Sequence, residues 1–301
     1  MDCANVVDVR HLAKTYGEVT ALHDLTVRVA SGEIFGFLGQ NGAGKTTAIK
    51  LLLGLTRRTS GNGTVMDRPL GAIEARRHIG YLPELFRYQP WLSAREVLVS
   101  HAALLGIRGA SVRRRIDELL ETVGLAQAAD RRVGTFSKGM QQRTGLAVAM
   151  LGEPKLIFLD EPTSALDPNG RADVRQILRE LKSRGTSVFL NSHLLSEVEQ
   201  VCDRVAIVRS GRVVAEGTLA EILGSARAVR VRATANGTPL SDVLGRFGRV
   251  VATTNGSLVV NGAGEEQTPA IVGALVAANA SVYEVEPLTA TLEERFLEMT
   301  R

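Results

Sequence analysis

The spacing of the hydrophobic residues changes along the chain, and each spacing predicts a different kind of element. Apolar and polar residues alternate at 7–9 and 25–29, which favours half-buried antiparallel strands near the N-terminus. Three later runs, at 155–159, 187–190 and 205–208, are short and mostly apolar, and segments with helical spacing lie between them. This alternation of buried strands and helices predicts an α/β fold with a parallel sheet.

Between residues 92 and 151 the spacing of the apolar residues is helical. Ser93 is followed three positions later by Glu96, which is the spacing of a capping box, and this predicts the start of one helix. A second helix is predicted to have Ser111 as its N-cap, with the three arginines at 113–115 mainly on its solvated side. Its predicted apolar stripe consists of Ile116, Leu119, Leu120 and Val123.

A different pattern begins near residue 224 and predicts a smaller second domain. The expected order is strand, helix, strand, strand, helix, strand, with a turn at Asn255-Gly256 between the second and third strands. This βαββαβ order is that of ferredoxin-like α+β domains. The predicted domains are therefore 1–223 and 224–301, and a last helix is expected at 292–299.

Composition and charge restrict the class of protein moderately. Of the 301 residues, 45% are hydrophobic and 23% charged, as in ordinary globular domains, and an aromatic content of 4% disfavours a surface that stacks nucleic-acid bases. The formal net charge of +4 permits contact with an anionic bilayer without requiring it. Cys3 and Cys202 lack metal-ligand spacing and are interpreted as free thiols. The sequence predicts neither a signal peptide nor a membrane span, so a membrane role would need a second protein.

Residues 39–46, Gly-Gln-Asn-Gly-Ala-Gly-Lys-Thr, lie between the apolar run at 34–38 and a segment with helical spacing. They fit the pattern G-x-x-x-x-G-K-[ST], in which glycines allow successive backbone N–H groups to face a phosphate at the N-terminus of the helix. Lys45 would reach the β- and γ-phosphates, and Thr46 would supply a hydroxyl to Mg²⁺. A chance match in a chain of this length is expected on the order of once in a hundred sequences.

The apolar run at 156–159 ends in two carboxylates, Asp160 and Glu161. Ligands of α/β folds bind at the carboxyl ends of the parallel strands, which is where Asp160 would lie. Asp160 is suited to hold Mg²⁺ through water, and Glu161 is suited to orient and deprotonate an attacking water. Taken alone, such a strand end is more often a helix cap or a surface turn. Together with the phosphate loop upstream, it predicts an ATPase site.

The segment 136–143, Phe-Ser-Lys-Gly-Met-Gln-Gln-Arg, lies between these two elements at the predicted start of a helix. Ser137 is suited to cap that helix, and Gly139 leaves room for a phosphate. The segment resembles the signature L-S-G-G-Q-x-Q-R of the ABC (ATP-binding cassette) family, with Lys138 in place of a glycine and Met140 in place of the glutamine. The resemblance implies that this segment contacts the γ-phosphate held by a second subunit, so that one chain cannot complete a site.

Further segments match the ABC family in its order along the chain, within about residues 6–223. The resemblance implies that Asp167, at the end of a Ser-Ala-Leu-Asp segment, crosses the dimer interface. It also implies that His193 is the switch histidine, which contacts the γ-phosphate. Tyr16 matches the aromatic residue that stacks on adenine, and Glu84 stands where the family commonly has the glutamine of the Q-loop.

The resemblance implies a P-loop NTPase core with antiparallel β and α-helical subdomains, whose cofactors are ATP and Mg²⁺. The catalytic residues that it implies are Glu161, His193 and Lys45. The metal ligands that it implies are Thr46, Glu84 and Asp160. The residues that would bind ATP are Tyr16, Gly39, Asn41, Gly42, Ala43, Gly44, Lys45, Thr46, Thr47, Ser137, Gly139 and Asp167.

The resemblance also implies two protein partners: a second ATPase subunit, expected to be a copy of this chain, and a separate membrane-spanning permease. The chain would then lie at the cytoplasmic face of the cell membrane. Three of its 13 aromatic residues, Phe86, Tyr88 and Trp91, are predicted to help form the docking surface for the permease. Segments 82–84, 136–140 and 291–297 resemble ATPase subunits of bacterial drug and multidrug exporters, so the expected process is export.

Two functions other than transport are compatible with an ATP-binding chain. A soluble ATPase that acts on nucleic acid or the ribosome would resemble relatives with two cassettes or a long coiled-coil insertion, but only 92 positions separate Lys45 from Ser137. A regulatory module that does not hydrolyse ATP is disfavoured by the presence of Lys45, Asp160, Glu161 and His193. The sequence therefore favours a transport ATPase without nucleic acid as a partner.

Overall fold

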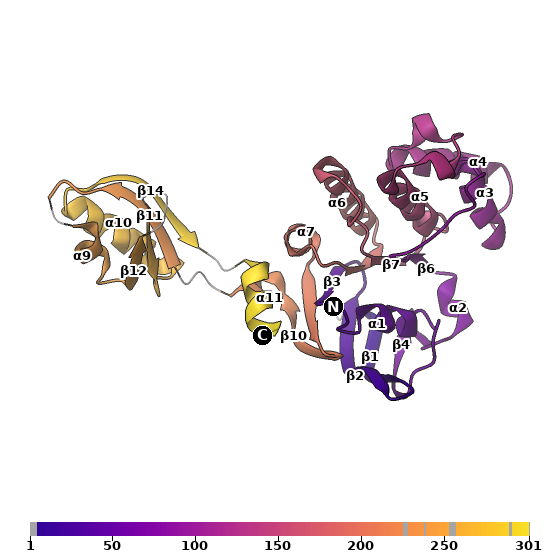
Figure 1. Ribbon diagram of the computed structural model, residues 1–301, viewed down its shortest axis with the longest axis horizontal. Helices are drawn as coiled ribbons and strands as arrows, with labels where there is room; N and C mark the ends of the chain where they lie inside the picture. The colour runs from indigo at the N-terminus through magenta and orange to yellow at the C-terminus, as the bar shows by residue number, and fades with distance from the viewer. Residues whose placement is uncertain (1–4, 225–227, 238, 253–256, 289–290, 301) are drawn as a thin grey trace. The chain divides into compact units, whose positions relative to one another are not determined.

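The computed structural model describes residues 5–224, 228–237, 239–252, 257–288 and 291–300. The chain forms two compact units, one of Met1–Leu219 together with Met299–Arg301 and the other of Ala220–Glu298 (Figure 1). The division thus falls after Leu219, whereas the sequence suggested a boundary after residue 223 and kept the last three residues in the second domain.

The first unit is built on one ten-stranded sheet with the strand order β5-β4-β1-β2-β10-β9-β3-β8-β7-β6. On one side β1 pairs antiparallel with β2 and β4, and β4 with β5. On the other side β9, β3, β8, β7 and β6 are parallel, and β10 pairs antiparallel with β9. The predicted α/β core with an antiparallel β subdomain is confirmed. The strands are β1 (Asn5–Tyr16), β2 (Val19–Ala30), β3 (Ile34–Gly39), β4 (Ser60–Val65), β5 (Arg68–Pro69), β6 (Ile79–Leu82), β7 (Leu156–Asp160), β8 (Ser187–Asn191), β9 (Arg204–Arg209) and β10 (Arg212–Thr218).

The central strands are held by a dry aromatic core. Every residue of β3, β7 and β8 is buried, as expected for parallel strands covered on both faces. The ring of Phe189 lies 5.1 to 5.6 Å from the rings of Phe35, Phe37 and Phe158. Each such burial contributes about 1.5–3 kcal/mol. The carboxyl ends of these three strands are therefore firmly positioned at one edge of the sheet.

Helices connect the strands of the first unit, and α3, α4 and α5 pack on one another as a helical subdomain (Figure 1). The helices are α1 (Lys45–Leu52), α2 (Ile73–Arg76), α3 (Ala94–Leu104), α4 (Ala110–Thr122), α5 (Lys138–Met150), α6 (Pro168–Ser183) and α7 (Leu195–Val201), with 3₁₀ turns at Ala126–Ala128 and Val133–Thr135.

The ends of these helices test the predicted capping residues. The capping box of Ser93 and Glu96 is present at the start of α3 and confirms that prediction. The prediction for α4 was wrong: the helix begins at Ala110 after Gly109, and Ser111 lies inside it. Gly109 has φ of 101°, a conformation that glycine adopts readily, so the chain turns into the helix earlier than a serine cap would require. The predicted apolar stripe is confirmed, with an exposure of 1% for each of Ile116, Leu119, Leu120 and Val123.

The second unit contains a four-stranded antiparallel sheet with the order β12-β13-β11-β14. Alternate residues of β11, Val229 and Val231, are fully buried and pack with Val260, Ile271 and Leu275. The elements follow the predicted βαββαβ order, and the predicted turn at Asn255-Gly256 lies outside the described residues. They are β11 (Ala228–Thr234), α9 (Leu240–Leu244), β12 (Arg249–Ala252), β13 (Leu258–Asn261), a 3₁₀ turn (Glu265–Gln267), α10 (Thr268–Ala277) and β14 (Ser281–Leu288), with α8 (Leu219–Leu223) before them and α11 (Leu292–Thr300) after them.

Two smaller expectations concern cysteines and membrane spans. Cys202 is a free thiol, and its burial raises its pKa, while Cys3 lies outside the described residues. Among the helices that the structure describes, none combines the length and the apolar content that a bilayer span requires.

Candidate functional site

The loop between β3 and α1 has a backbone path that requires glycine. Gly42 and Gly44 have φ of 83° and 99°, in the left-handed region. At Gly44 a Cβ atom would lie 2.5 Å from the carbonyl oxygen of Ala21, so no side chain fits there. Helix α1 begins at Lys45 without a side-chain cap. Its first N–H groups are therefore available to an anion, as the sequence pattern predicts.

Lys45 folds back over this loop. Its Nζ donates to the carbonyl oxygens of Gly39 at 2.7 Å and Gln40 at 3.2 Å, and the residue is 7% exposed. Burial lowers the pKa of Lys45, and the nearby charges of Glu161 and Asp160 oppose that shift. The ammonium group thus lies between the loop and two carboxylates, where a phosphate could replace the carbonyl oxygens as its partner.

Asp160 ends β7 at the carboxyl edge of the sheet and is 1% exposed. Its carboxylate accepts hydrogen bonds from Asn191 Nδ2 and, at 3.5 Å, from Thr46 Oγ1. Burial raises the pKa of Asp160, and the charge of Glu84 acts in the same direction. Glu84 is exposed, and its charge acts to raise the pKa values of both Lys45 and Asp160.

The donor set around Asp160 fits Mg²⁺. This ion prefers hard oxygen ligands and is usually held by one or two carboxylates together with substrate phosphates, not by a cage of protein ligands. Thr46 and Asp160 supply such oxygens beside the phosphate loop. No cluster of three or more His, Cys, Asp or Glu with ligand geometry occurs among the residues that the structure describes.

Glu161 is a buried carboxylate in an uncommon backbone conformation. It is 6% exposed and has φ of 56°, a left-handed value that is rare outside glycine and tends to occur at functional sites. His193 Nδ1 lies 2.7 Å from Glu161 Oε2, and the His193 backbone N–H donates to the same oxygen at 3.4 Å. Burial raises the pKa of Glu161, whereas His193 and Lys45 lower it. The carboxylate is therefore fixed in orientation by the histidine.

The two raised carboxylate pKa values predict an unusual dependence of stability on pH. Asp160 and Glu161 ordinarily have pKa values of 3.8 and 4.5, and the folded protein keeps their protons at higher pH than the unfolded chain does. Their contribution to the unfolding free energy is therefore fully present below those ordinary values and is lost as the pH rises through the folded pKa values.

The contribution of Asp160 can be measured as the difference in thermal unfolding between the nucleotide-free wild type and Asp160→Asn. We expect the wild type to lose stability relative to the variant as the pH rises from about 4 towards neutrality. If the wild type gained stability relative to Asp160→Asn over that interval, the raised pKa of Asp160 would be wrong.

Ser137, Gly139 and Asp167 form a second group, on different elements. Ser137 Oγ caps α5 by accepting from the backbone N–H of Met140 at 3.2 Å, and Asp167 caps α6 by accepting from Gly170 N at 2.8 Å. A Cβ atom at Gly139 would lie 3.2 Å from Leu166 Cδ2, so the signature segment adjoins the segment of Asp167. Within the described residues no hydrogen bond or ion pair joins this group to Lys45 or to Thr46.

The remaining predicted residues lie at the surface. The Tyr16 side chain at the end of β1 is 45% exposed, and Lys14 Nζ lies 4.5 Å from the centre of its ring. Asn41 is exposed on the phosphate loop, where Ala43 is buried and Thr46 and Thr47 begin α1 half-buried. The exposed ring of Tyr16 has the character of a stacking platform, but one of its faces is shared with Lys14.

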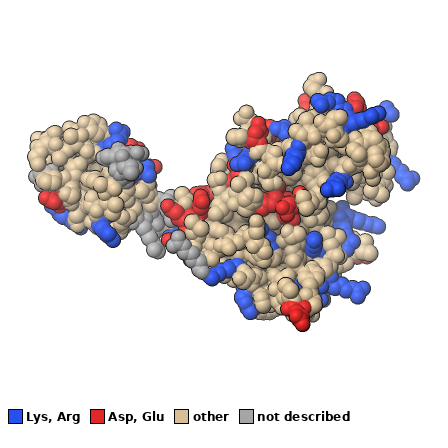
Figure 2. Space-filling model, viewed as in Figure 1, with Lys and Arg blue, Asp and Glu red and all other residues tan. Residues whose placement is uncertain are grey.

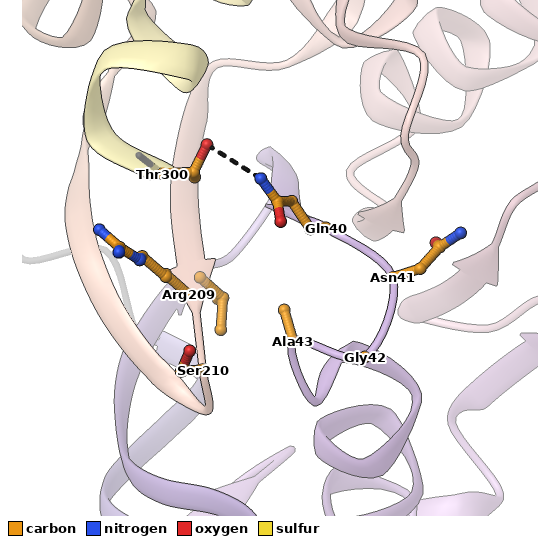
Figure 3. Close-up of a pocket in the computed structure, with 8 residues that line it drawn as sticks. Gln40, Asn41, Gly42, Ala43, Arg209, Ser210 and Thr300 are labelled. Carbon is orange, nitrogen blue, oxygen red and sulfur yellow. Dashed lines mark hydrogen bonds between the residues drawn. The ribbon is translucent and has the colours of Figure 1, made fainter.

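A pocket of about 270 Å³ lies beside the phosphate loop (Figure 3). The loop residues 40–43 form one wall, and 208–210 at the β9–β10 turn form another, with Thr300 at the rim. Gln40 Nε2 donates to Thr300 Oγ1 at 3.5 Å, and Asn41 points away from both Arg209 and Thr300 (Figure 3). Its walls include residues 40–43 of the phosphate loop but neither Lys45 nor Asp160, so this pocket adjoins the predicted phosphate position on one side only.

Sequence reasoning missed two polar residues that support the site. Asn191, at the end of β8, donates to Asp160, and Gln142 Nε2 donates to the backbone oxygen of Glu161 at 3.2 Å. Both are buried, with exposures of 2% and 6%. A polar residue at the end of an apolar strand was an available signal for Asn191. Gln142 belongs to the signature segment, but its contact with Glu161 depends on tertiary packing.

Comparisons with known proteins agree on one family. The chain matches the family described as ABC transporter over residues 22–164. It is 38% identical to an uncharacterised ABC transporter ATP-binding protein of a Synechocystis species, over 99% of this chain and 85% of that relative. It is also 38% identical to the Nod factor export ATP-binding protein I of a Rhizobium species, over 70% of each chain.

A solved structure extends the comparison to three dimensions. It is a dimeric ATP-binding cassette in a post-hydrolysis state, bound to ADP and Pi. The likeness has a TM-score of 0.65 and 27% sequence identity, and it covers 71% of this chain and 98% of that one. The two relatives are named as ATP-binding proteins, and the solved structure is that of an ATP-binding cassette. The geometry around Lys45 and Glu161 also indicates a nucleotide site.

Proposed function

Because the chain belongs to the ABC transporter family as an ATP-binding subunit that binds and hydrolyses ATP, we propose that it powers export through a separate membrane-spanning permease. The Nod factor export relative supports the direction of transport. The observation that carries the catalytic assignment is the buried Glu161 carboxylate, which His193 orients at 2.7 Å beside Asp160 and Lys45.

In the proposed site the triphosphate of ATP lies against residues 39–46. The free N–H groups at the start of α1 face its oxygens, and Lys45 exchanges the carbonyl oxygens of Gly39 and Gln40 for phosphate oxygens. Thr46, Asp160 and Glu84 would hold Mg²⁺, which would supply positive charge to offset the charge of the phosphates. Tyr16 stacks on the adenine ring, a contact that its 45% exposure allows.

Glu161 acts as the general base in this proposal. Burial raises the pKa of Glu161, which makes its carboxylate a better proton acceptor than an ordinary glutamate, while His193 and Lys45 act in the opposite direction. Glu161 takes the proton from the attacking water. His193 donates to the carboxylate from Nδ1. When both ring nitrogens carry protons, the half-exposed ring could also donate from Nε2 towards the γ-phosphate.

We infer that a second copy of the chain completes each site. Ser137 and Gly139 at the start of α5, together with Asp167, would approach the phosphates held by Lys45 of the other copy. Two observations support this arrangement: the absence of described hydrogen bonds between these two groups within one chain, and the likeness to a dimeric cassette. Two ATP molecules would then be clamped between two chains, so that ATP binding closes the dimer and hydrolysis reopens it.

The permease would dock near the segment that follows β6. The three aromatic residues predicted there divide into two kinds. Phe86 and Tyr88 are partly buried and pack with each other, with ring centres 5.3 Å apart, whereas Trp91 and Leu85 are 63% and 88% exposed. The docking surface that we propose therefore consists mainly of Leu85 and Trp91, and the partly buried pair Phe86 and Tyr88 supports the same segment. Docking there would hold the chain at the cytoplasmic face of the membrane.

This proposal is tested by expressing the chain with the membrane protein encoded by a neighbouring reading frame. We expect the two to copurify from detergent-solubilised membranes, and the pair to move a substrate out of the cytoplasmic compartment in an ATP-dependent way. The double variant Leu85→Ala, Trp91→Ala is expected to reduce copurification by at least about tenfold, because exposed aromatic anchors carry much of the energy of an interface.

The matched control for this test is Val214→Ala on β10, which truncates another exposed apolar side chain, one that is 45% exposed and lies on a different element. It should leave copurification unchanged, and ATP binding by both variants should stay normal. Full assembly of the Leu85→Ala, Trp91→Ala chain would refute the docking surface. Failure of the wild-type chain to copurify with any membrane protein of the cell would refute the proposed transport.

A further inference from the structure

A second surface of the first unit is strongly basic. Residues 50–77 contain six Lys or Arg and two Asp or Glu, so that 28 residues carry a formal charge of +4, the same value as the whole chain. All six basic residues are exposed. Figure 2 shows Lys and Arg side chains over the region that Figure 1 labels α1, α2 and β4. The charge of this segment is thus presented to the outside.

Several contacts gather this segment into one surface. Arg76 donates from Nη2 to the carbonyl oxygen of Gly54 at 2.7 Å and from Nε to that of Leu53 at 3.1 Å, which fixes α2 against the end of α1. The backbone N–H of Leu55 donates to Lys50 O at 2.8 Å. A cavity of about 580 Å³ opens between 54–61 and 70–71. Its walls include Arg57, Arg58 and the hydroxyl-bearing residues Thr56, Thr59 and Ser60.

The positive charges of this surface are not neutralised by close ion pairs in the part of the chain that the structure describes. Among the described residues no ion pair within 4.0 Å is made by Lys50, Arg57, Arg58 or Arg77, and the contacts of Arg58 and Arg76 are to backbone oxygens. Two large apolar side chains lie among these charges, Leu55 at 56% and Ile73 at 70% exposure. We call this surface the basic patch. It consists of Lys50, Leu55, Arg57, Arg58, Ile73, Arg76 and Arg77.

We propose that the basic patch binds the phosphate headgroups of anionic lipids at a bilayer surface. Guanidinium groups match phosphate oxygens in geometry and charge, and the hydroxyl-bearing residues of the cavity offer further donors. Leu55 and Ile73 enter the boundary between headgroups and acyl chains, as apolar residues beside basic ones do in proteins that lie on membranes. Leu55 and Ile73 would add little to the binding of a nucleic acid, because bases stack on aromatic side chains and not on aliphatic ones.

This inference goes beyond the proposed function. The basic patch contains none of the residues assigned to ATP, Mg²⁺ or the docking of the permease. A permease would bring the chain close to the bilayer, and the basic patch would then fix which side of the subunit faces the lipid. The two proposals can fail separately, because lipid binding is measured with the chain alone and transport is measured with the permease.

The test measures flotation of the full chain with vesicles of phosphatidylcholine and with vesicles that also contain about 30% phosphatidylglycerol, an anionic lipid. We expect binding to the anionic vesicles only, and we expect it to weaken as salt rises from about 0.1 to 0.5 M. The variant Arg57→Glu, Arg58→Glu should weaken binding by more than about 25-fold, because the loss of each basic residue near an anionic surface costs about fivefold and the two new carboxylates are repelled in addition. Ile73→Ser should weaken it a few fold.

The matched control is Arg113→Glu, Arg114→Glu on α4, which makes the same change of charge at two exposed arginines of another element. It should retain most of the binding, and Arg57→Lys, Arg58→Lys should do the same. ATP hydrolysis by the wild type and by each charge variant reports correct folding.

Three outcomes would overturn the proposal. Equal losses in the two Arg-to-Glu pairs would mean that net charge alone drives the binding. A failure of the wild-type chain to float with anionic vesicles would exclude lipid as the ligand. If the wild type did not float, and Arg57→Glu, Arg58→Glu also lost copurification with the permease, the surface would bind an acidic protein segment and not a lipid.

Discussion

Replacement of Glu161 by glutamine is expected to lower ATP hydrolysis by at least about a hundredfold, the usual scale for loss of a positioned general base. Glutamine keeps the shape of the side chain but cannot take a proton from water. The amide can still face His193, whose Nδ1 lies 2.7 Å from the carboxylate, so the surroundings should change little. ATP binding should remain, because the contacts of Lys45 with the phosphate loop do not involve Glu161 directly.

The variant should consequently accumulate as a closed dimer with MgATP, which size-exclusion chromatography would detect alongside the release of inorganic phosphate. A matched control is Glu197→Gln on α7. Glu197 is also a buried carboxylate, 9% exposed, and pairs with Arg175 at 2.6 Å outside the site. Its replacement should leave the hydrolysis rate of the folded protein close to that of the wild type. Normal turnover by Glu161→Gln would remove the residue from its proposed role.

The phosphate loop could be predicted from the sequence because its requirements are local. Gly44 and Gly42 need φ values that other residues rarely adopt, and the neighbouring strand and helix are defined by their own apolar spacing. The same is true of Asp160, since a wholly apolar strand must be buried and its end must lie at an edge of the sheet. Local chemistry of this kind is readable without knowing the fold.

Features that depend on tertiary packing were harder to predict from the sequence. The bond from Gln142 to the backbone of Glu161 joins residues 19 positions apart on different elements, and the left-handed backbone of Glu161 is imposed by its surroundings. The docking aromatics are another example, because composition alone could not separate Trp91, which is exposed, from Tyr88, which packs edge-on against His101. The Ser111 cap failed because a glycine two residues earlier already turned the chain.

If each ATP site is divided between two chains, damage to either half should abolish hydrolysis. Lys45→Ala removes the cation that faces the phosphates, and Ser137→Glu places a carboxylate where a phosphate is expected. Each variant alone should lose at least about a hundredfold in hydrolysis, because both sites of its dimer are damaged. The loss of the serine cap itself costs about 1 kcal/mol, which thermal unfolding can check.

Mixing the two variants should restore activity. In a mixed dimer one site contains both altered residues, while the other contains the intact Lys45 of one chain and the intact Ser137 of its partner. Random pairing makes half of the dimers mixed, so up to roughly a quarter of the wild-type number of complete sites should return. Phosphate release would be measured after the chains have been denatured and refolded together, and tags on the two variants would verify the pairing.

A second mixture provides the internal control. Lys45→Ala and Glu161→Gln damage residues that act on the same side of the site, so every site in their mixed dimer lacks one of the two. No activity should return, and tags on the two variants would verify that mixed dimers have formed. If each site is formed by two chains, ATP hydrolysis should recover in the first mixture and should not recover in the second. Recovery in both mixtures, or in neither when pairing has been verified, would contradict the proposal that Ser137 of one chain completes the site of Lys45 in the other.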